Sequence, residues 1–471
     1  MKEDLGTERH RGWVIWVSIF AALLVGVGIF FYYNFLRQSQ SELIDAIPTD
    51  AVFLFEINDN ETFAKDISPL QSYFNEMFSM DALAAYETVN GKLPKGRYNV
   101  IISGHQSETS IHLLFNTRIE KAAFKHLLRA LSIDPANFQS IEQHKVYTYG
   151  TNLKSLKFTY YNHILSVSDD IGLLQKAIIQ HSHPKNILSN DNFKKLYGLT
   201  QKNKKQNWVI INNAAYYDFV GTFFNENFNK TLTHVKAQAD WSAYQLRMSQ
   251  NELFLSGYVT AQSDDFKDFI DKSPKCSIPE IVMPFKTDWY YKIEKDGISG
   301  CFFSMTADST QQYRYLVVKR DTIHDKFAKF TSEKLDEIQN AYPNGIYPCS
   351  DTLFKLNNIS NVDKSEFKVF TITNGHYVLA QSEEAMTLYL RDLNQNGGIA
   401  DNRYYKFSKS NIASTNLLEF TYYNPVDRKP ILRSMSEKGA AGKLAQRMSI
   451  FSISCNNVSA DYAMVNVYIC F

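Results

Sequence analysis

Two histidines, His181 and His183, are separated by a single residue and form the closest histidine pair in the sequence. Imidazole is a common metal ligand, so this pair could begin a metal site. A protein metal site needs at least one more ligand, and none is evident nearby in the sequence. We therefore expect a solvated loop after a helix, and we predict no metal or cofactor.

Two pairs of carboxylates, in Ser168-Asp-Asp170 and Ser382-Glu-Glu384, could serve as paired catalytic acids. Each pair instead lies where a strand ends and a helix is expected to begin. A hydroxyl there caps free backbone N–H groups, and acidic side chains favour the positive end of the helix dipole. The pattern therefore favours a structural role. His163 and His376 recur at matching turns, which also suits a structural role.

Other catalytic patterns are absent from the sequence. It contains no nucleophile elbow, no His-Glu-x-x-His segment, no phosphate-binding glycine loop and no Cys-x-x-Cys pair. This favours a protein that is not an enzyme, although an unrecognised hydrolase stays open as a hypothesis. The odd number of cysteines leaves their pairing undetermined; they are Cys276, Cys301, Cys349, Cys455 and Cys470.

A dense aromatic stripe near helical spacing is the main candidate for a binding surface. Such a stripe could line a pocket for lipid or an apolar peptide, touch a membrane, or simply form core. The candidate contacts are Tyr216, Phe219, Phe223 and Phe224. The matching stretch of the second half, 428–447, is basic instead, which suggests contact with anionic headgroups.

The charge balance excludes one class of function. Lys and Arg together number 50 and Asp and Glu number 49, giving a net charge of +1. A nucleic-acid-binding protein usually shows a basic excess or stripe, so we expect no nucleic-acid partner. The aromatic content of 14% favours strands and a large core.

Residues 13–33 form an uncharged apolar run that predicts a single membrane-spanning anchor. Lys2, Arg9 and Arg11 precede it, so the positive-inside rule places the N-terminus in the cytoplasm and the body outside. A cleaved signal peptide is the alternative, but the run is long for one. The interfacial aromatic residues of the anchor are Trp13, Trp16, Tyr32 and Tyr33. A homodimer could form through the small-residue stripe of Ser18, Ala22 and Gly26.

The body shows an internal repeat. Phe158–His163 resembles Phe370–His376, and further pairs of similar segments follow at separations of about 210 residues. We therefore predict an α+β fold in which an N-terminal transmembrane helix precedes two tandem, duplicated α+β units with largely antiparallel sheets. The predicted segments are a cytoplasmic tail (1–12), the anchor (13–33), a tether (34–46), unit 1 (45–262), a linker (263–279) and unit 2 (280–471).

This layout resembles a bacterial family of membrane-anchored extracytoplasmic proteins known only as a domain of unknown function. The resemblance lies in the N-terminal anchor, in the opening segment Ile47-Pro-Thr-Asp-Ala-Val-Phe53, and in the element 192–212, a short helical stretch followed by a strand. It implies a single-pass protein of the bacterial cytoplasmic membrane with a periplasmic or cell-surface body. It transfers no catalytic residues.

Three hypotheses about function follow from these patterns. The first is a non-enzymatic binding or scaffold protein of the cell envelope with a protein partner. The second is a carrier of lipid or another apolar ligand, and the third is the unrecognised hydrolase. An apolar cavity would favour the second hypothesis. A cleft gathering acids and histidines from both halves would favour the third, and an exposed apolar groove or sheet edge would favour the first.

Overall fold

The computed structural model describes most of the body of the chain. The described residues are 43–59, 62–63, 65, 68, 82–94, 98–107, 110–151, 154–183, 185–203, 205–221, 239–249, 251–272, 279–295, 298–307, 311–319, 341–349, 364–411, 416–423 and 449–470.

Nineteen strands of the described residues belong to a single sheet, and every pairing between them is antiparallel. The strands are β1 (Ala51–Ile57), β2 (Val100–Gln106), β3 (Ile111–Arg118), β4 (Gln139–Ile141), β5 (His144–Thr151), β6 (Lys154–Tyr161), β7 (Ile164–Ser168), β8 (Trp208–Asn212), β9 (Ala239–Met248), β10 (Glu252–Ala261), β11 (Trp289–Lys295), β12 (Ile298–Thr306), β13 (Gln312–Lys319), β14 (Tyr347–Pro348), β15 (Val369–Thr373), β16 (His376–Ala380), β17 (Leu417–Tyr423), β18 (Ile450–Ser459) and β19 (Tyr462–Cys470).

Helices pack on this sheet at several places along its length. The described α-helices are α4 (Ala82–Lys92), α5 (Lys121–Ala130), α6 (Ile171–Ser182), α7 (Asp191–Thr200), α8 (Asn213–Gly221), α10 (Asp264–Lys272), α14 (Glu383–Asn396) and α15 (Arg403–Ser410). A short 3₁₀ helix, η2 (Leu43–Ala46), opens the described chain.

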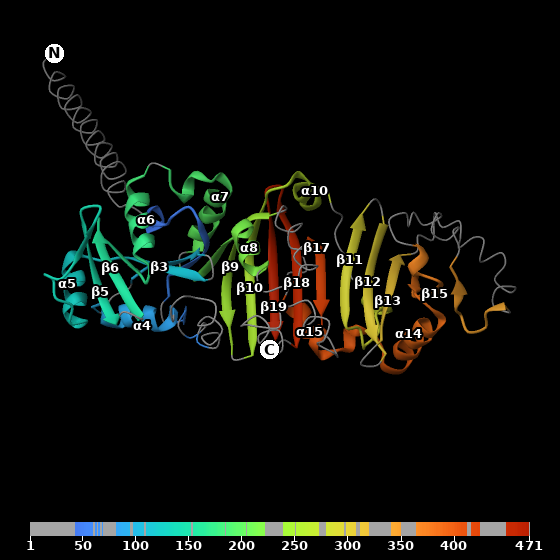
Figure 1. Cartoon of the computed structure of the whole chain (residues 1–471). Helices are drawn as coiled ribbons and strands as arrows, with labels where there is room; N and C mark the ends of the chain where they lie inside the picture. The colour runs from blue at the N-terminus through green and yellow to red at the C-terminus, as the bar shows by residue number, and fades with distance from the viewer. Residues whose placement is uncertain are drawn as a thin grey trace, which may run out of the picture.

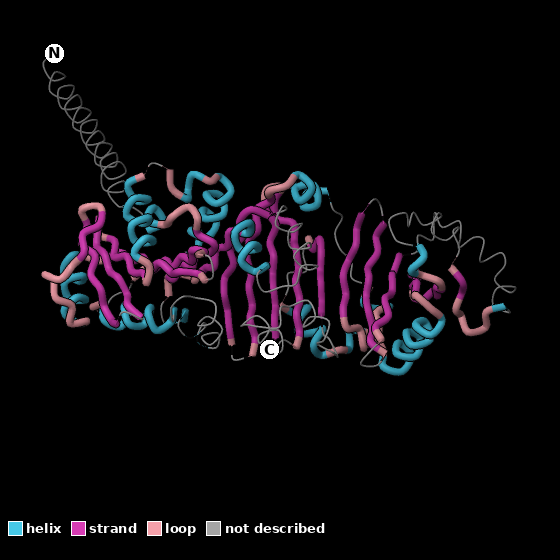
Figure 2. Tube along the Cα trace, in the orientation of Figure 1, coloured by secondary structure: helices cyan, strands magenta, loops and turns pink. Residues whose placement is uncertain are grey.

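The strand registers give the order of the sheet from edge to edge. It runs β4-β5-β6-β7-β3-β2-β1-β8-β9-β10-β19-β18-β17-β11-β12-β13-β16-β15-β14. The two halves meet where β10 pairs with β19, from Glu252 opposite Cys470 to Thr260 opposite Tyr462. Figures 1 and 2 show the result, an elongated body in which strands of both halves stand side by side across the centre.

The predicted fold class is wrong. Instead of an anchor helix followed by two tandem, duplicated α+β units, the described residues form one antiparallel sheet with eight α-helices packed on it. The reason is the pairing of β10 with β19, which fuses the two halves through their last strands. Alternation of apolar residues identifies strands, but it does not say which strand edges pair over such a sequence separation.

No helix in the described part of the chain is long and apolar enough to cross a membrane. The predicted anchor lies outside the described residues, and so do the cytoplasmic tail and most of the tether. The last residues of the tether form η2, where Ile44 and Ala46 are buried. The predicted linker contains helix α10.

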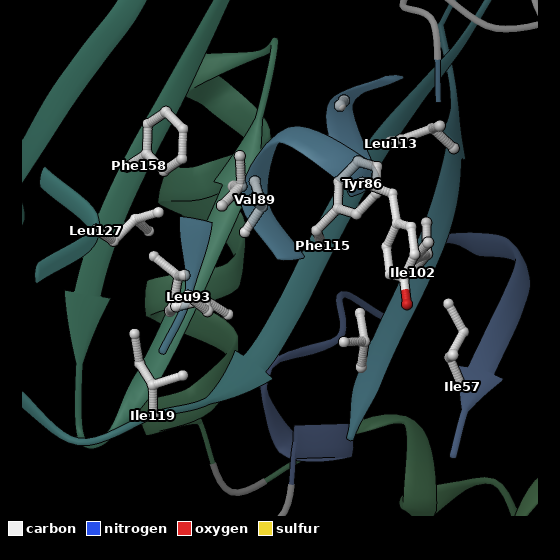
Figure 3. Packing of buried hydrophobic residues seen from close by; sticks show 14 of the residues in the cluster. Ile57, Tyr86, Val89, Leu93, Ile102, Leu113, Phe115, Ile119, Leu127 and Phe158 are labelled. Atoms are coloured by element: carbon white, nitrogen blue, oxygen red, sulfur yellow. The ribbon is translucent and has the colours of Figure 1, made fainter. Parts of the chain in front are cut away.

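The first half of the sheet is covered on both faces. Phe53 and Ile57 of β1 point into one hydrophobic cluster beside α4 and α5, whereas Leu54 points into another that contains residues of α7. Successive side chains of a strand point to opposite faces, so burial on both sides explains the nearly continuous apolar sequence of β1. Figure 3 shows the first cluster, in which Leu127 of α5 and Phe158 of β6 lie among residues of the sheet.

The start of α5 is tied to the turn between β6 and β7. The backbone N–H of Ile119 donates to the carbonyl of His163 at 2.9 Å. Asn162 and His163 form that turn with positive φ angles of 44° and 64°, as two-residue hairpin turns require. Helix α5 is thereby held against the β5–β6 hairpin at one end of the body (Figure 1).

Candidate functional site

A pocket of about 700 Å³ lies between α5 and the β5–β6 hairpin. It is open to solvent and is built by the first half of the chain alone. Its lining residues are Lys121, Phe124, Lys125, Leu128, Arg129, Pro135, Gln143, His144, Lys145, Tyr147, Tyr160, Tyr161 and Asn162.

Buried and half-buried apolar side chains form the bottom of this pocket. Phe124 stacks on Tyr160 with ring centroids 5.0 Å apart, and its ring lies 5.8 Å from that of Tyr147. All three belong to, or pack against, the hydrophobic cluster that α5 forms with the sheet. We call Phe124, Leu128, Tyr147, Tyr160 and Tyr161 the apolar floor.

Four exposed cationic side chains also line the pocket. Lys121, Lys125 and Arg129 follow one another at four-residue intervals on α5, so they lie on one face of the helix. Lys145 comes from β5, and its Nζ lies 4.1 Å from the ring centroid of Phe138. We call these four residues the cationic rim: Lys121, Lys125, Arg129 and Lys145.

The lining of the pocket carries an excess of positive charge, with the nearby Glu120 carboxylate at the start of α5. None of its lining residues is acidic, and no described carboxylate forms an ion pair with the cationic rim. Burial raises the pKa of Tyr147 and, together with the Glu120 carboxylate, that of Tyr160. These phenols therefore stay neutral and able to donate hydrogen bonds, and the pocket is net positive at neutral pH.

Tyr161 of the apolar floor also contacts the segment with which the described chain begins. The Tyr161 ring lies 5.7 Å from that of His144 and 5.5 Å from that of His181. Tyr161 is buried in a small cluster with Ala46 of η2 and with Ile164 and Ile178. Tyr161 therefore connects the pocket to η2, the first described element of the chain, which packs on the face of the sheet opposite α5.

The two histidines of the pair lie at the C-terminal end of α6. His181 lies in the last turn of α6, where burial lowers its pKa, and its Nδ1 is 3.3 Å from Asn162 Nδ2. His183 caps the same helix in an exposed position. The described residues contain no group of three metal-ligating side chains.

The paired acids act at helix starts. The Asp170 carboxylate accepts from the Leu173 N–H at 3.0 Å, and the Ser382 hydroxyl accepts from the Ala385 N–H at 3.2 Å. Asp169 lies 3.2 Å from His112. His163 lies 3.6 Å from Glu120, and the Nδ1 of His376 lies 2.8 Å from the Asn374 carbonyl oxygen.

Of the predicted aromatic stripe, only the side chain of Tyr216 is described, and it does not line the pocket. Tyr216 is half-buried on α8 and packs against the cluster between the sheet, α4 and α5. The backbone of Phe219 is part of α8, but its side chain is not described. Phe223 and Phe224 lie outside the described residues. The anchor aromatics Trp13, Trp16, Tyr32 and Tyr33 and the stripe Ser18, Ala22 and Gly26 lie outside them as well.

A Ser–His–Asp array that sequence patterns did not indicate joins two residues of β2 to Asp50, which precedes β1. Ser103 Oγ is 2.9 Å from His105 Nε2, and His105 Nδ1 is 2.8 Å from Asp50 Oδ1. This is the connectivity of a hydrolase triad. Ser103 is 0% exposed, however, so no substrate carbonyl can approach its hydroxyl. The array therefore satisfies buried polar groups, and Lys176 completes it at 2.8 Å from Asp50.

Comparison with known proteins adds little to this geometry. No protein family matches the chain, and no curated protein does. Among solved structures, crystal form IV of TP0453 aligns at 10% identity and a TM-score of 0.26, covering 47% of this chain and 82% of that one. Crystal form III of TP0453 aligns at 9% identity and a TM-score of 0.25, covering 50% and 88%. Superpositions this weak carry no argument about fold or function.

Proposed function

We propose that this protein is a non-enzymatic binding protein of the cell envelope that takes an amphiphilic ligand into the pocket between α5 and the β5–β6 hairpin. The observation that carries the proposal is the pocket itself, whose volume of about 700 Å³ falls within the usual range for small-molecule sites. Its apolar floor supplies the contact area, and neutral phenols supply hydrogen bonds.

Attachment to a membrane through residues 13–33 is part of the proposal. It is supported by the uncharged apolar run and by the basic residues that precede it. This arrangement would hold the body at the outer surface of the cytoplasmic membrane, where amphiphilic ligands are concentrated.

A binding role agrees better with the described residues than hydrolysis does. The one Ser–His–Asp array found among them is closed to solvent at Ser103. The pocket holds His144 but no carboxylate among its described lining residues, so they offer no carboxylate–histidine pair.

Photolabelling of the full chain in mild detergent tests this function. A neutral decyl alcohol carrying a diazirine would be crosslinked and its attachment sites mapped by mass spectrometry. We expect labels on α5 and on the β5–β6 hairpin. Lys125→Trp should remove them, because an indole at this exposed lining position would cover the apolar floor.

Ala122→Trp is the matched control, because Ala122 is an exposed residue of the same helix outside the pocket lining. It should leave the labels in place. Labels spread evenly over the body, or labels that persist in Lys125→Trp, would contradict the proposed function.

A further inference from the structure

The cationic rim opposes the stability of the helix that carries most of it. Lys121, Lys125 and Arg129 are like charges at four-residue spacing, which repel one another on a helix. Lys121 also stands in the first turn, where the helix dipole disfavours a cation, and the N-cap residue Glu120 makes no side-chain capping bond. An anion in the pocket would relieve both effects.

The rim is also narrow enough to act on one group. Lys121 and Arg129 are eight residues apart on α5, so their Cα atoms are separated by about 12 Å along the axis. Flexible lysine and arginine side chains from both ends can converge on a shared point, and Lys145 lines the same pocket from β5. A phosphate group, with several acceptor oxygens, matches such a convergence of donors.

The apolar floor indicates that the ligand also has an apolar part. Phe124, Leu128 and Tyr160 lie within the same pocket as the cations. A bare inorganic anion would leave this surface in contact with water. A ligand with both an anionic group and an apolar body would cover the floor and neutralise the rim together.

The position of the pocket points to the source of such a ligand. Tyr161, which belongs to the apolar floor, packs against Ala46 of η2, with Leu43 beside it. From Tyr33, at the end of the proposed anchor, to Leu43 the chain spans at most about 36 Å when fully extended. On the proposed membrane attachment, the body therefore stays close to the lipid headgroups, with the pocket on the face of the sheet opposite η2.

We propose that the pocket binds the phosphate-bearing headgroup of an anionic membrane lipid, with the phosphate held by the cationic rim and the start of the acyl region against the apolar floor. The inference rests on the proposed function and names its ligand class. Phosphate on an apolar body is the recognised chemistry, and a soluble phosphorylated amphiphile would share it.

The test is calorimetric titration of the full chain in nanodiscs of phosphatidylcholine. The probes are hexyl phosphate, inorganic phosphate and hexyl glucoside. We expect hexyl phosphate to bind at least about tenfold more tightly than either of the others. Its affinity should also fall as the salt concentration rises from about 50 to about 300 mM.

Variants separate charge recognition from folding. Lys125→Ala with Arg129→Ala should weaken hexyl phosphate at least about tenfold and leave hexyl glucoside unchanged, because alanine keeps α5 helical. The control pair Lys194→Ala and Lys202→Ala removes two exposed cations outside the pocket lining and should change neither affinity.

The outcomes separate this inference from the function on which it rests. Equal binding of hexyl phosphate and hexyl glucoside, or no effect of the rim variant, would overturn the anion inference and leave the binding function standing. Equal affinities for inorganic phosphate and hexyl phosphate would overturn the lipid inference and indicate free phosphate as the ligand. Binding of neither hexyl compound would overturn both proposals.

A second arm identifies the source of the ligand. Nanodiscs containing phosphatidylglycerol should weaken the apparent affinity for hexyl phosphate, because the lipid headgroup would compete for the rim. An unchanged affinity in these nanodiscs would overturn the lipid source in favour of a soluble phosphorylated amphiphile.

Discussion

Phe124 and Tyr160 stack with ring centroids 5.0 Å apart and ring planes inclined by 13°, which joins α5 directly to β6. The pair lies in the hydrophobic cluster on one side and lines the pocket on the other. One contact therefore holds the helix and shapes the site, so stability and ligand binding should change together when it is removed.

Phe124→Ala should lower the free energy of unfolding by about 3–5 kcal/mol, because it leaves a cavity under α5. Urea unfolding of the full chain measures the change. Phe138→Ala is the control, since Phe138 is 41% exposed, and it should cost less than about 1 kcal/mol. Equal losses in the two variants would show that the Phe124–Tyr160 stack does not hold α5.

The cationic rim gives a prediction of the opposite sign. Without ligand, the triple variant Lys121→Ala, Lys125→Ala and Arg129→Ala should unfold at a temperature equal to or above that of the natural protein. Each repulsive pair destabilises the helix by about 0.2–0.5 kcal/mol, so its removal should stabilise α5 by that amount. A clearly lower unfolding temperature would mean that these side chains stabilise the fold. The cluster of positive charge would then have a structural role and would not indicate an anionic ligand.

Gly257 lies in β10, between β9 and β19, where a side chain has no room. A Cβ atom there would collide with the backbone carbonyl of Ala243 on β9. Gly257→Ala should therefore cost at least about 2 kcal/mol of stability. A Cβ atom at Gly198 on α7 would have no atom within 4 Å. Gly198→Ala should therefore raise the free energy of unfolding by about 0.5–1 kcal/mol. Similar urea midpoints for both variants would contradict the tight β9–β10 pairing.

Asp50 predicts a dependence of stability on pH. Its hydrogen bond with His105, supported by Lys176, holds the pKa of the carboxyl well below its usual range despite partial burial. The unfolded-state pKa is about 3.9, so the ionised group stabilises the fold above about pH 4. This contribution is lost as the pH falls below that value.

Asp50→Asn should therefore destabilise the protein at pH 7, and the difference from the natural protein should shrink between about pH 4 and pH 2. Thermal unfolding across this range measures it. The exposed residue Asp271 offers a control, and Asp271→Asn should show a much smaller effect. A difference for Asp50→Asn that stays constant down to pH 2 would rule out the ionised carboxylate as its cause.

Local elements were predictable from the sequence, and the sheet was not. The turn at Asn162–His163 and the cap at Ser382 follow from short-range side-chain chemistry. The hydroxyl cap expected of Ser168 was wrong, because the Asp170 carboxylate caps α6 instead. The pairing of β10 with β19 depends on two strand edges about 200 residues apart, and nothing in either strand specifies its partner.

The site was predictable only in part. Its helix showed apolar residues at helical spacing, but the basic residues at positions 121, 125 and 129 gained meaning only once the hairpin lay opposite them. The net charge of +1 conceals this local excess. The array of Ser103, His105 and Asp50 left one sign in the sequence, a serine and a histidine two residues apart on one strand face. Asp50 could not be assigned to them, because it is far away in the sequence.

The most direct test of the binding function is to identify what the protein carries out of its native membrane. The natural chain and Lys125→Trp would be purified in mild detergent, and their organic extracts compared by mass spectrometry. We expect about one molecule of an anionic amphiphile per natural chain, and none with the variant whose pocket is filled. Equal amounts of the same lipids with both proteins would contradict a ligand site between α5 and the β5–β6 hairpin.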